Sequence, residues 1–356
     1  MSVKEELVGF KFQYHTVLVL FLDKPKYFVS LASEKLDEDC VLKTVDGNYW
    51  FVQCKFSSNR DKPNKGLMSK GLIDLKKHQK ENVEELILAT NIYYPFCKKS
   101  LFLSSSCLDI KSFNNLHIDE RKKISEYLKG FKTNSKIRNK PNKYDVENSF
   151  SYAYLNYDMP RDDLNNSQYL VEKIKDFIGM NNHFTYVPIK SVAESWLRIV
   201  ENEACKITLS DDDNMVDKGC LAGAFCNCML FRNSFTEISL KYNFQITDIE
   251  AEILDYCDNY KDLFIEEAID ASYSIWSDFL QFKNASSSID IYKCRHDYID
   301  HLTINDRMPS FIQDSFSQKG EEKEIFQLQV YKYFVACVIE NSDLILEARK
   351  EFGCDN

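Results

Sequence analysis

Residues 49–56 read YWFVQCKF, and this stretch decides the fold of the first half of the chain. Aromatic and β-branched residues dominate it, which is typical of a β-strand. Successive side chains of a strand point to opposite faces. Phe51, Gln53 and Lys55 therefore share one face, and the apolar residues between them point the other way. Two polar side chains on one face of an otherwise apolar strand are unusual, so this face is a candidate for function.

The flanking segments predict an α/β core in the order α-β-β-β-α-β. An N-terminal segment carries apolar residues at three- and four-residue steps, which predicts a helix that Pro25 ends. Asp46-Gly47 is a hairpin turn signal between the second and third strands. The other predicted elements are strands at residues 27–32, 40–45 and 85–91 and a helix at residues 67–80.

Charge divides the chain near residue 145. Residues 1–143 contain 26 Lys and Arg against 17 Asp and Glu, a net charge of +9, whereas residues 144–356 carry −19. Such a break predicts two domains, residues 1–145 and 146–356, with different partners. The second is predicted to be mainly α-helical and to dock a protein partner or another copy of the chain. Its predicted helical stretches are residues 169–180, 191–200, 247–282 and 324–349, together with residues 217–231, which are apolar almost all round and therefore expected to be buried.

Composition excludes several classes of protein. The chain has 356 residues, of which 44% are hydrophobic and 13% aromatic, and this argues against a mainly disordered protein. No apolar run approaches the ~20 residues that span a bilayer, so we expect no membrane partner and a cytoplasmic location. The twelve Cys show no repeated C-x-x-C pairing, so we expect reduced thiols and no zinc site.

Basic residues gather in residues 62–80 and 129–143. Because positive charge favours contact with phosphate, both clusters are candidate nucleic-acid contacts. A solvated surface and a soluble linker are the alternatives, since Pro141 and several Asn residues occur in the second cluster. The candidate contacts are Lys65, Lys70, Lys76, Lys77, Lys132, Lys136 and Arg138.

An acidic residue is expected near the polar face of residues 49–56. Asp39 directly precedes the second predicted strand, and the hairpin brings it toward Gln53 and Lys55. The Asp39 carboxylate, the Gln53 side-chain carbonyl and the Cys54 backbone carbonyl offer oxygen ligands that suit Mg²⁺ or Mn²⁺. Such an ion polarises a phosphodiester and activates water, while Lys55 can orient the water or neutralise growing charge. Glu34 can hold a second ion or a metal-bound water.

Four motifs within residues 9–91 resemble those of the PD-(D/E)xK restriction-like nucleases, in the variant with Gln at the second acidic position, as in Mrr-like enzymes. The resemblance is closer still to the DNA-degrading effector nucleases of bacterial anti-phage systems. The motifs are a G-F-x-x-Q helix at Gly9-Phe10-Lys11-Phe12-Gln13, an acidic Glu34…Asp39 segment, a Q-x-K strand at Phe51-Val52-Gln53-Cys54-Lys55, and a later strand that ends in Thr90-Asn91.

The resemblance implies a restriction-endonuclease-like fold for the first ~150 residues. It implies catalysis by Asp39, Gln53 and Lys55, with Gln13 and Glu34 as supporting residues. In CBASS systems such a domain is fused to a cyclic-oligonucleotide sensor, and in Lamassu systems it is a separate subunit beside an SMC-type ATPase. No such sensor is recognised in the second half, which favours a Lamassu-like subunit with an SMC-like ATPase partner.

The acidic position of the pattern admits Asp37, Glu38 or Asp39, and Asp39 is preferred because it lies closest to the predicted strand. The sequence therefore predicts a Mg²⁺-dependent endonuclease for double-stranded DNA. We expect an anti-phage effector subunit that a partner or homo-oligomeric self-assembly activates. The alternative is a catalytically silent nucleic-acid-binding or scaffold subunit, with the motif merely an acidic turn and a polar stripe on an edge strand. An RNA-directed nuclease is a third possibility, because the motif does not distinguish the sugars.

Overall fold

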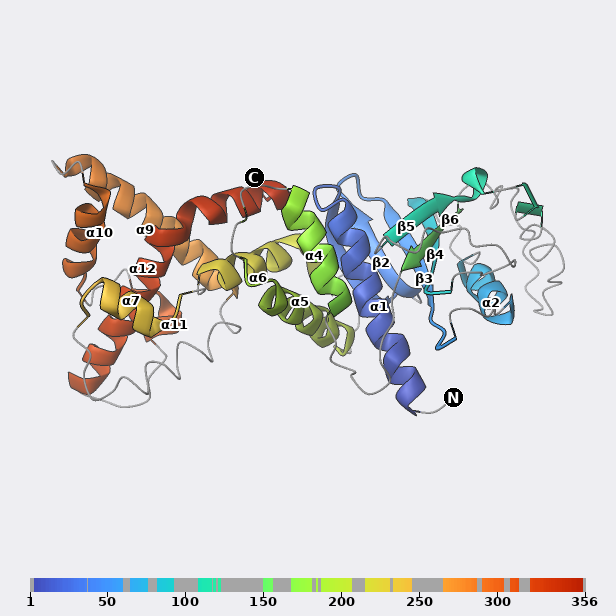
Figure 1. Ribbon diagram of the computed structural model, residues 1–356, viewed down its shortest axis with the longest axis horizontal. Coiled ribbons are helices and arrows are strands. Elements are labelled where there is room, and N and C mark those ends of the chain that lie inside the picture. The colour runs from blue at the N-terminus through green and yellow to red at the C-terminus, as the bar shows by residue number, and fades with distance from the viewer. Residues whose placement is uncertain are drawn as a thin grey trace. The chain divides into compact units, whose positions relative to one another are not determined.

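The computed structural model divides the chain into two compact units, which are described separately (Figure 1). The first unit comprises residues 1–180 and 196–218, and the second comprises residues 181–195 and 219–356. The structure describes residues 3–36, 38–59, 65–75, 82–92, 108–116, 118–119, 121–122, 150–155, 168–180, 184, 187–206, 215–230, 233–244, 265–286, 290–303, 308–313 and 321–354.

A seven-stranded mixed sheet forms the core of the first unit. Its strand order is β5-β6-β4-β3-β2-β1-β7, in which β3, β4 and β6 run parallel and the remaining pairs are antiparallel. The predicted order of elements is confirmed from the first helix to the fourth strand. The strands are β1 (Phe28–Lys35), β2 (Glu38–Thr44), β3 (Tyr49–Lys55), β4 (Val83–Thr90), β5 (Leu108–Ser112), β6 (Phe150–Leu155) and β7 (Val216–Asp217).

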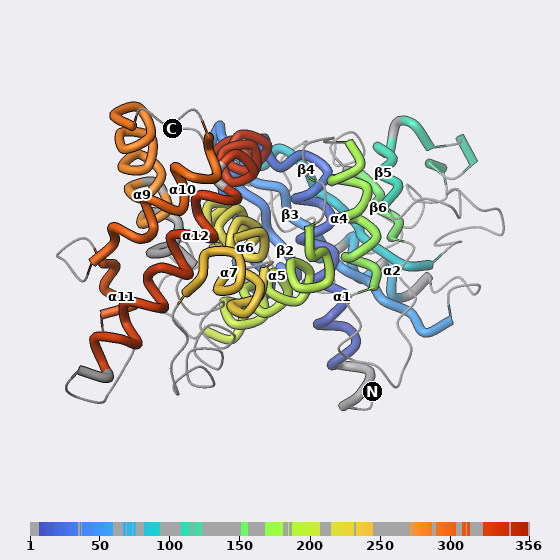
Figure 2. The backbone as a smooth tube through the Cα atoms, turned by 60° about the vertical axis from the view of Figure 1, so that its left-hand side comes forward, coloured from blue at the N-terminus to red at the C-terminus, as the bar shows by residue number. Residues whose placement is uncertain are grey.

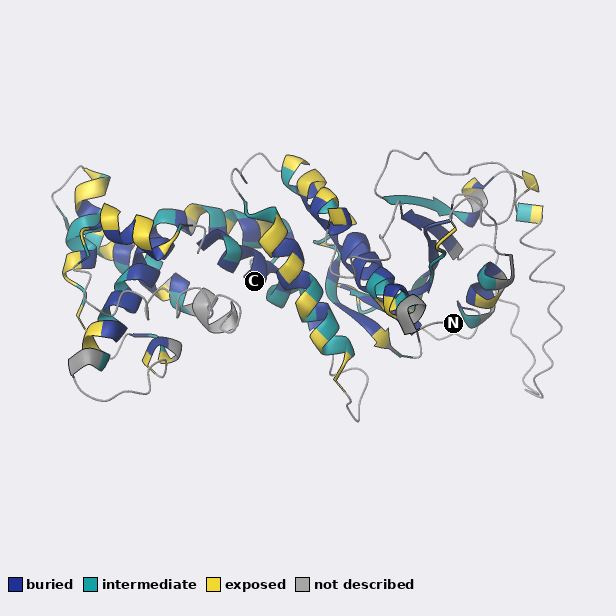
Figure 3. Ribbon diagram, turned by 60° about the horizontal axis from the view of Figure 1, so that its bottom comes forward, coloured by how far each residue is buried: buried dark blue, intermediate teal, exposed yellow. Residues whose placement is uncertain are grey.

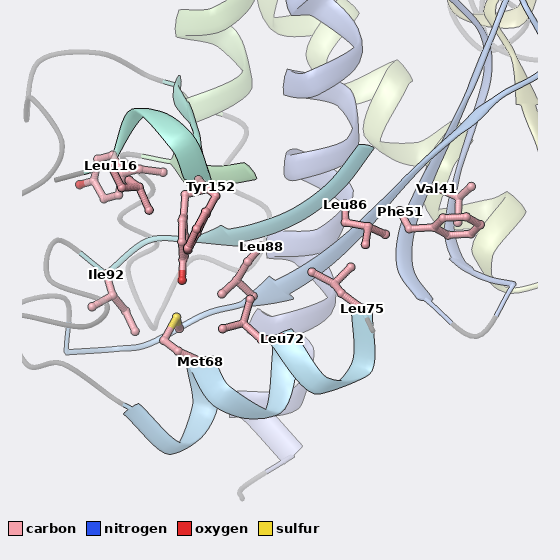
Figure 4. Close-up of a cluster of buried hydrophobic side chains, with 12 residues drawn as sticks. Val41, Phe51, Met68, Leu72, Leu75, Leu86, Leu88, Ile92, Leu116 and Tyr152 are labelled. Carbon is pink, nitrogen blue, oxygen red and sulfur yellow. The ribbon is translucent and has the colours of Figure 1, made fainter. Parts of the chain in front are cut away.

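Helices cover both faces of this sheet. On one face lies α1 (Val3–Asp23), whose apolar residues from Phe12 to Leu22 are buried against β1, β2 and β3. On the other face α2 (Lys65–Leu75) directs Met68, Leu72 and Leu75 toward the strands, where they pack in one buried cluster (Figure 4). Most of the sheet is buried as a result, as the dark blue strands in Figure 3 show.

The structure places the end of the first unit later than residue 145. Strand β6 pairs with β4 and β5, so residues 150–155 belong to the sheet and not to a separate helical domain. Helix α4 (Gln168–Met180) packs along α1, as Figures 1 and 2 both show. The boundary predicted from charge is corrected because strand pairing, which charge does not report, joins segments about 60 residues apart.

The second unit is helical among its described residues. The long helix α12 (Glu321–Phe352) packs against α7, α9, α10 and α11. Of the stretch predicted as a helix at residues 247–282, residues 247–264 lie outside the described part of the chain. The other helices beyond α4 are α5 (Ile189–Ala204), which crosses the division, α6 (Lys218–Leu230), α7 (Phe235–Lys241), α9 (Ile265–Ala285), α10 (Ile291–Asp300) and α11 (Ser310–Gln313).

Two ion pairs on α12 hold three helices of this unit together. Glu340 accepts hydrogen bonds from Lys241 Nζ at 2.7 Å and from Arg295 Nη1 at 3.2 Å, and so joins α12 to α7 and α10. The Tyr242 hydroxyl donates to the same carboxylate.

No helix in the described ranges is long and apolar enough to cross a membrane.

Deletion tests the corrected boundary. A fragment of residues 1–145 lacks β6 and with it two buried tyrosines of the core cluster, Tyr152 and Tyr154. We expect it to lose cooperative thermal unfolding measured by circular dichroism, whereas residues 1–220 unfold cooperatively. Cooperative unfolding of residues 1–145 at the same temperature as residues 1–220 would contradict this division.

Candidate active site

The site lies where β2 and β3 separate. The backbone ladder between these strands runs from Lys43 opposite Tyr49 to Cys40 opposite Val52. Beyond that pair the Cys54 N–H donates to a side chain instead, Asp39 Oδ2, at 2.7 Å. The carboxylate therefore takes the position of a ladder acceptor, and it is held against the backbone of β3.

The structure brings Asp39, Gln53 and Lys55 together. Because residues two apart on a strand share a face, Gln53 and Lys55 lie side by side, and Lys55 Nζ donates to Gln53 Oε1 at 2.5 Å. The same ammonium group lies 3.3 Å from Asp39 Oδ2. The side chains of Lys55 and Asp39 are only 11% and 20% exposed. The three predicted residues thus form one hydrogen-bonded group that is largely, but not fully, buried.

Glu38 is a fourth member, an acid that the sequence pattern also admits but that lies one residue farther than Asp39 from the predicted strand. Its side chain is buried, and it accepts a hydrogen bond from Gln53 Nε2. Alternation along a strand predicts that Glu38 and Asp39 point to opposite faces, so only one of them is expected at the site. Both reach β3 because the ladder has ended at Cys40 and the two strands are free to diverge.

Gly71 on α2 allows the lysine to occupy its position, and no sequence signal marked it. A Cβ atom at residue 71 would lie 2.9 Å from Lys55 Cε and 2.6 Å from Leu88 Cδ1. Real Cβ contacts are essentially never this short. The missing side chain lets the Lys55 methylene groups pass between α2 and the sheet.

Thr90, the last residue of β4, and Asn91, which follows it, bind the segment of chain after Lys55. Thr90 Oγ1 donates to the Lys55 carbonyl oxygen at 2.8 Å. The Asn91 amide pairs with the backbone of Ser57, accepting from its N–H at 2.8 Å and donating to its carbonyl at 2.9 Å. The role of these two residues in the structure is to support the segment after the site.

Gln13 and Glu34 meet next to this group. Glu34 adopts a positive φ of 57° on β1, and a hydrogen bond with Gln13 favours its charged form. Gln13 Oε1 is buried and has no hydrogen-bond partner among the described residues. An unpaired buried acceptor is costly, and a donor or cation at this position would relieve that cost.

The carboxylates of the site are destabilised in their charged form. Burial raises the pKa of Asp39, and the charge of Lys55 only partly opposes this effect. Burial and the charge of Asp39 raise the pKa of Glu34 in the same way, and Lys55 again opposes. One ammonium group therefore stabilises the charge of both carboxylates, and an added cation would stabilise them further.

The donor set fits a magnesium or manganese ion held largely by water and substrate. No group of three or more His, Cys, Asp or Glu side chains suited to a metal occurs in the described ranges. Mg²⁺ is usually held by one or two carboxylates together with waters and phosphate oxygens, so such a group is not required. Asp39 Oδ1 forms no hydrogen bond with the described residues, and Gln53 Oε1 keeps one lone pair. The Cys54 carbonyl points toward β2, as does its N–H.

The proposed nucleic-acid contacts are described only in part. Lys70 is exposed on α2, and Lys65 begins that helix. The other five, Lys76, Lys77, Lys132, Lys136 and Arg138, lie outside the described residues, as does Asp37.

Comparison with known proteins identifies no relative. No protein-family model, no curated protein and no solved structure matches this chain.

Substituting Asp39 tests its electrostatic cost. Because its pKa is raised in the folded state, the free energy of unfolding falls as pH rises from the unfolded pKa toward the folded one, and the loss persists above both values. Asp39→Asn removes that charge but keeps an acceptor for the Cys54 N–H. We expect the melting temperature of Asp39→Asn, taken relative to wild type at the same pH, to be higher at pH 7 than near pH 3, because the wild-type carboxylate ionises in this range and the asparagine does not.

Asp46→Asn is the matched control, because Asp46 is exposed in the turn at the other end of the same hairpin. Thermal denaturation of the three proteins across this pH range provides the measurement. The prediction is contradicted if the melting temperature of Asp39→Asn, taken relative to wild type at the same pH, is lower at pH 7 than at pH 3. The ion pair with Lys55 would then outweigh the cost of burying the Asp39 carboxylate.

Proposed function

We propose that this chain is a Mg²⁺- or Mn²⁺-dependent endonuclease that cleaves double-stranded DNA. The observation that carries the proposal is the convergence of Asp39, Gln53 and Lys55 at the open end of the β2–β3 hairpin. A phosphodiesterase requires oxygen ligands for a divalent ion and a positive group beside the phosphate, and these residues supply both.

Each residue has a defined part in the proposed chemistry. When bound, the divalent ion supplies charge neutralisation and a more acidic water. Asp39 and the Gln53 carbonyl oxygen are the side chains that would hold it, with the Cys54 backbone carbonyl as a third donor. The Lys55 ammonium has three donors, of which two engage Gln53 and Asp39. The third is available to orient a water or to contact a phosphate oxygen.

Charge supports a nucleic-acid substrate. Residues 1–143 carry a net charge of +9, and Lys70 is exposed on the helix that covers the Lys55 side of the sheet. The motif resemblance extends the proposal to a restriction-endonuclease-like fold and to an effector subunit of bacterial anti-phage defence in the cytoplasm. The helical second unit would then dock an SMC-like ATPase or a second copy of the chain.

The alternative function is a catalytically silent subunit that binds nucleic acid or serves as a scaffold. The Lys55 side chain is buried and paired with Asp39, as it would be if its role were in folding. A buried pair of charges can exist in a protein without any chemical role. The two functions predict different effects of losing Lys55 on DNA cleavage.

Lys55→Ala separates them. We expect it to lower Mn²⁺- or Mg²⁺-dependent cleavage of supercoiled plasmid by about 10²–10³-fold, because a positive group beside the reacting phosphate is lost. DNA binding, measured by gel shift, should be retained. Lys43→Ala is the control, since Lys43 lies on the same hairpin but over the Tyr49 ring. Equal cleavage by Lys55→Ala and wild type, or binding without cleavage by wild type, would favour the silent subunit.

A further inference from the structure

The side-chain amide of Gln53 is held on both of its sides. Gln53 is buried, with an exposed fraction of 5%. Its Nε2 donates to Glu38 Oε2, and its Oε1 accepts from Lys55 Nζ. An ionised carboxylate only accepts hydrogen bonds and an ammonium group only donates them. The two neighbours therefore allow only one orientation of the amide.

Orientation matters because the two ends of an amide do opposite things. The carbonyl oxygen can bind a cation, whereas the NH₂ group would repel it. A rotation of 180° about the last side-chain bond would direct the NH₂ group, in place of the oxygen, at Lys55 and at the proposed ion. A glutamine in this position thus needs a neighbour that selects the useful orientation.

We propose that Glu38 is a positioning residue that fixes the Gln53 amide with its oxygen toward Lys55 and the metal site. The inference rests on the proposed function. Glu38 does not need to touch the ion or the substrate. Glu38 is buried, whereas its neighbour Asp39 is only partly buried. The two adjacent acids therefore have different roles. Asp39 lies at the site, and Glu38 binds the Gln53 amide from the buried side.

The same contact accounts for glutamine, and not glutamate, at residue 53. A glutamate there would place two buried carboxylates within hydrogen-bond distance of each other. Like charges this close cannot both ionise without a large cost. A carboxylate at residue 53 would therefore require a neutral donor at residue 38. Lys55 could still donate to it as it does to Gln53.

A reciprocal exchange tests this relation in the full-length chain. Glu38→Gln and Gln53→Glu are made singly and together, and the double variant reverses donor and acceptor while it keeps the contact. We expect each single variant to lose about 10–100-fold in cleavage or in apparent Mn²⁺ affinity, because partners of metal ligands usually have effects of this size. The double variant should recover to within about threefold of wild type.

Three readouts separate positioning from general stability. They are plasmid cleavage, the Mn²⁺ concentration for half-maximal cleavage, and the rise in melting temperature that Mn²⁺ produces. Glu38→Gln should raise the Mn²⁺ requirement and leave DNA binding unchanged. The matched control is Glu85→Gln, since Glu85 is a partly buried acid of the same sheet that accepts from Ser151 away from the site. It should leave all three readouts unchanged.

The outcomes distinguish this inference from the proposed function. If wild type cleaves DNA and the double variant is no better than the two single losses combined, Glu38 does not position Gln53. An unchanged Mn²⁺ requirement in Glu38→Gln would overturn the role as well. If wild type neither cleaves nor gains stability with Mn²⁺, the proposed function fails, and the positioning role fails with it.

Discussion

The ammonium group of Lys55 can lie in the interior of the first unit only because Asp39 and Gln53 receive it. A lysine side chain that is 11% exposed has lost most of its hydration, and removing its partners would leave an uncompensated charge. The requirement is mutual, since Asp39 is also removed from water. Its Oδ2 accepts from both Lys55 Nζ and the Cys54 N–H. This shared acceptor joins the site to the strand that carries it.

The neighbouring strands and helix α2 position Asp39, Gln53 and Lys55. Strand β3 lies between β2, which it leaves after Val52, and β4, with which it pairs as far as Lys55. The site therefore lies where β3 has left β2, while on the β4 side Thr90 and Asn91 bind the chain at Lys55 and Ser57. On the covering helix, Gly71 leaves room for the lysine stem. These features position a few polar atoms on a rigid sheet, which is how proteins keep reactive groups in place.

The electrostatics of the site come at a cost to folding. Burial raises the pKa of both Glu34 and Asp39, so their ionised forms are less stable in the folded chain than in the unfolded one. Clusters of this kind are concentrated where proteins bind ions or perform chemistry, although structural networks also produce them. Gln13 Oε1, which has no hydrogen-bond partner in the part of the chain that the structure describes, adds a further cost beside Glu34. A cation bound beside Asp39 would offset the electrostatic cost of the two carboxylates.

The sequence by itself determined the core order of elements and the shared face of Gln53 and Lys55, because strand alternation and turn signals are local. The Asp46-Gly47 turn was also enough to predict that Asp39 comes near that face. Only the tertiary structure decided that Glu38 joins Asp39, since this depends on where two strands diverge. It also decided that β6 completes the sheet beyond residue 145 and that Gly71 admits Lys55. These contacts join residues far apart in the chain, and no local pattern of side chains encodes the distance between them.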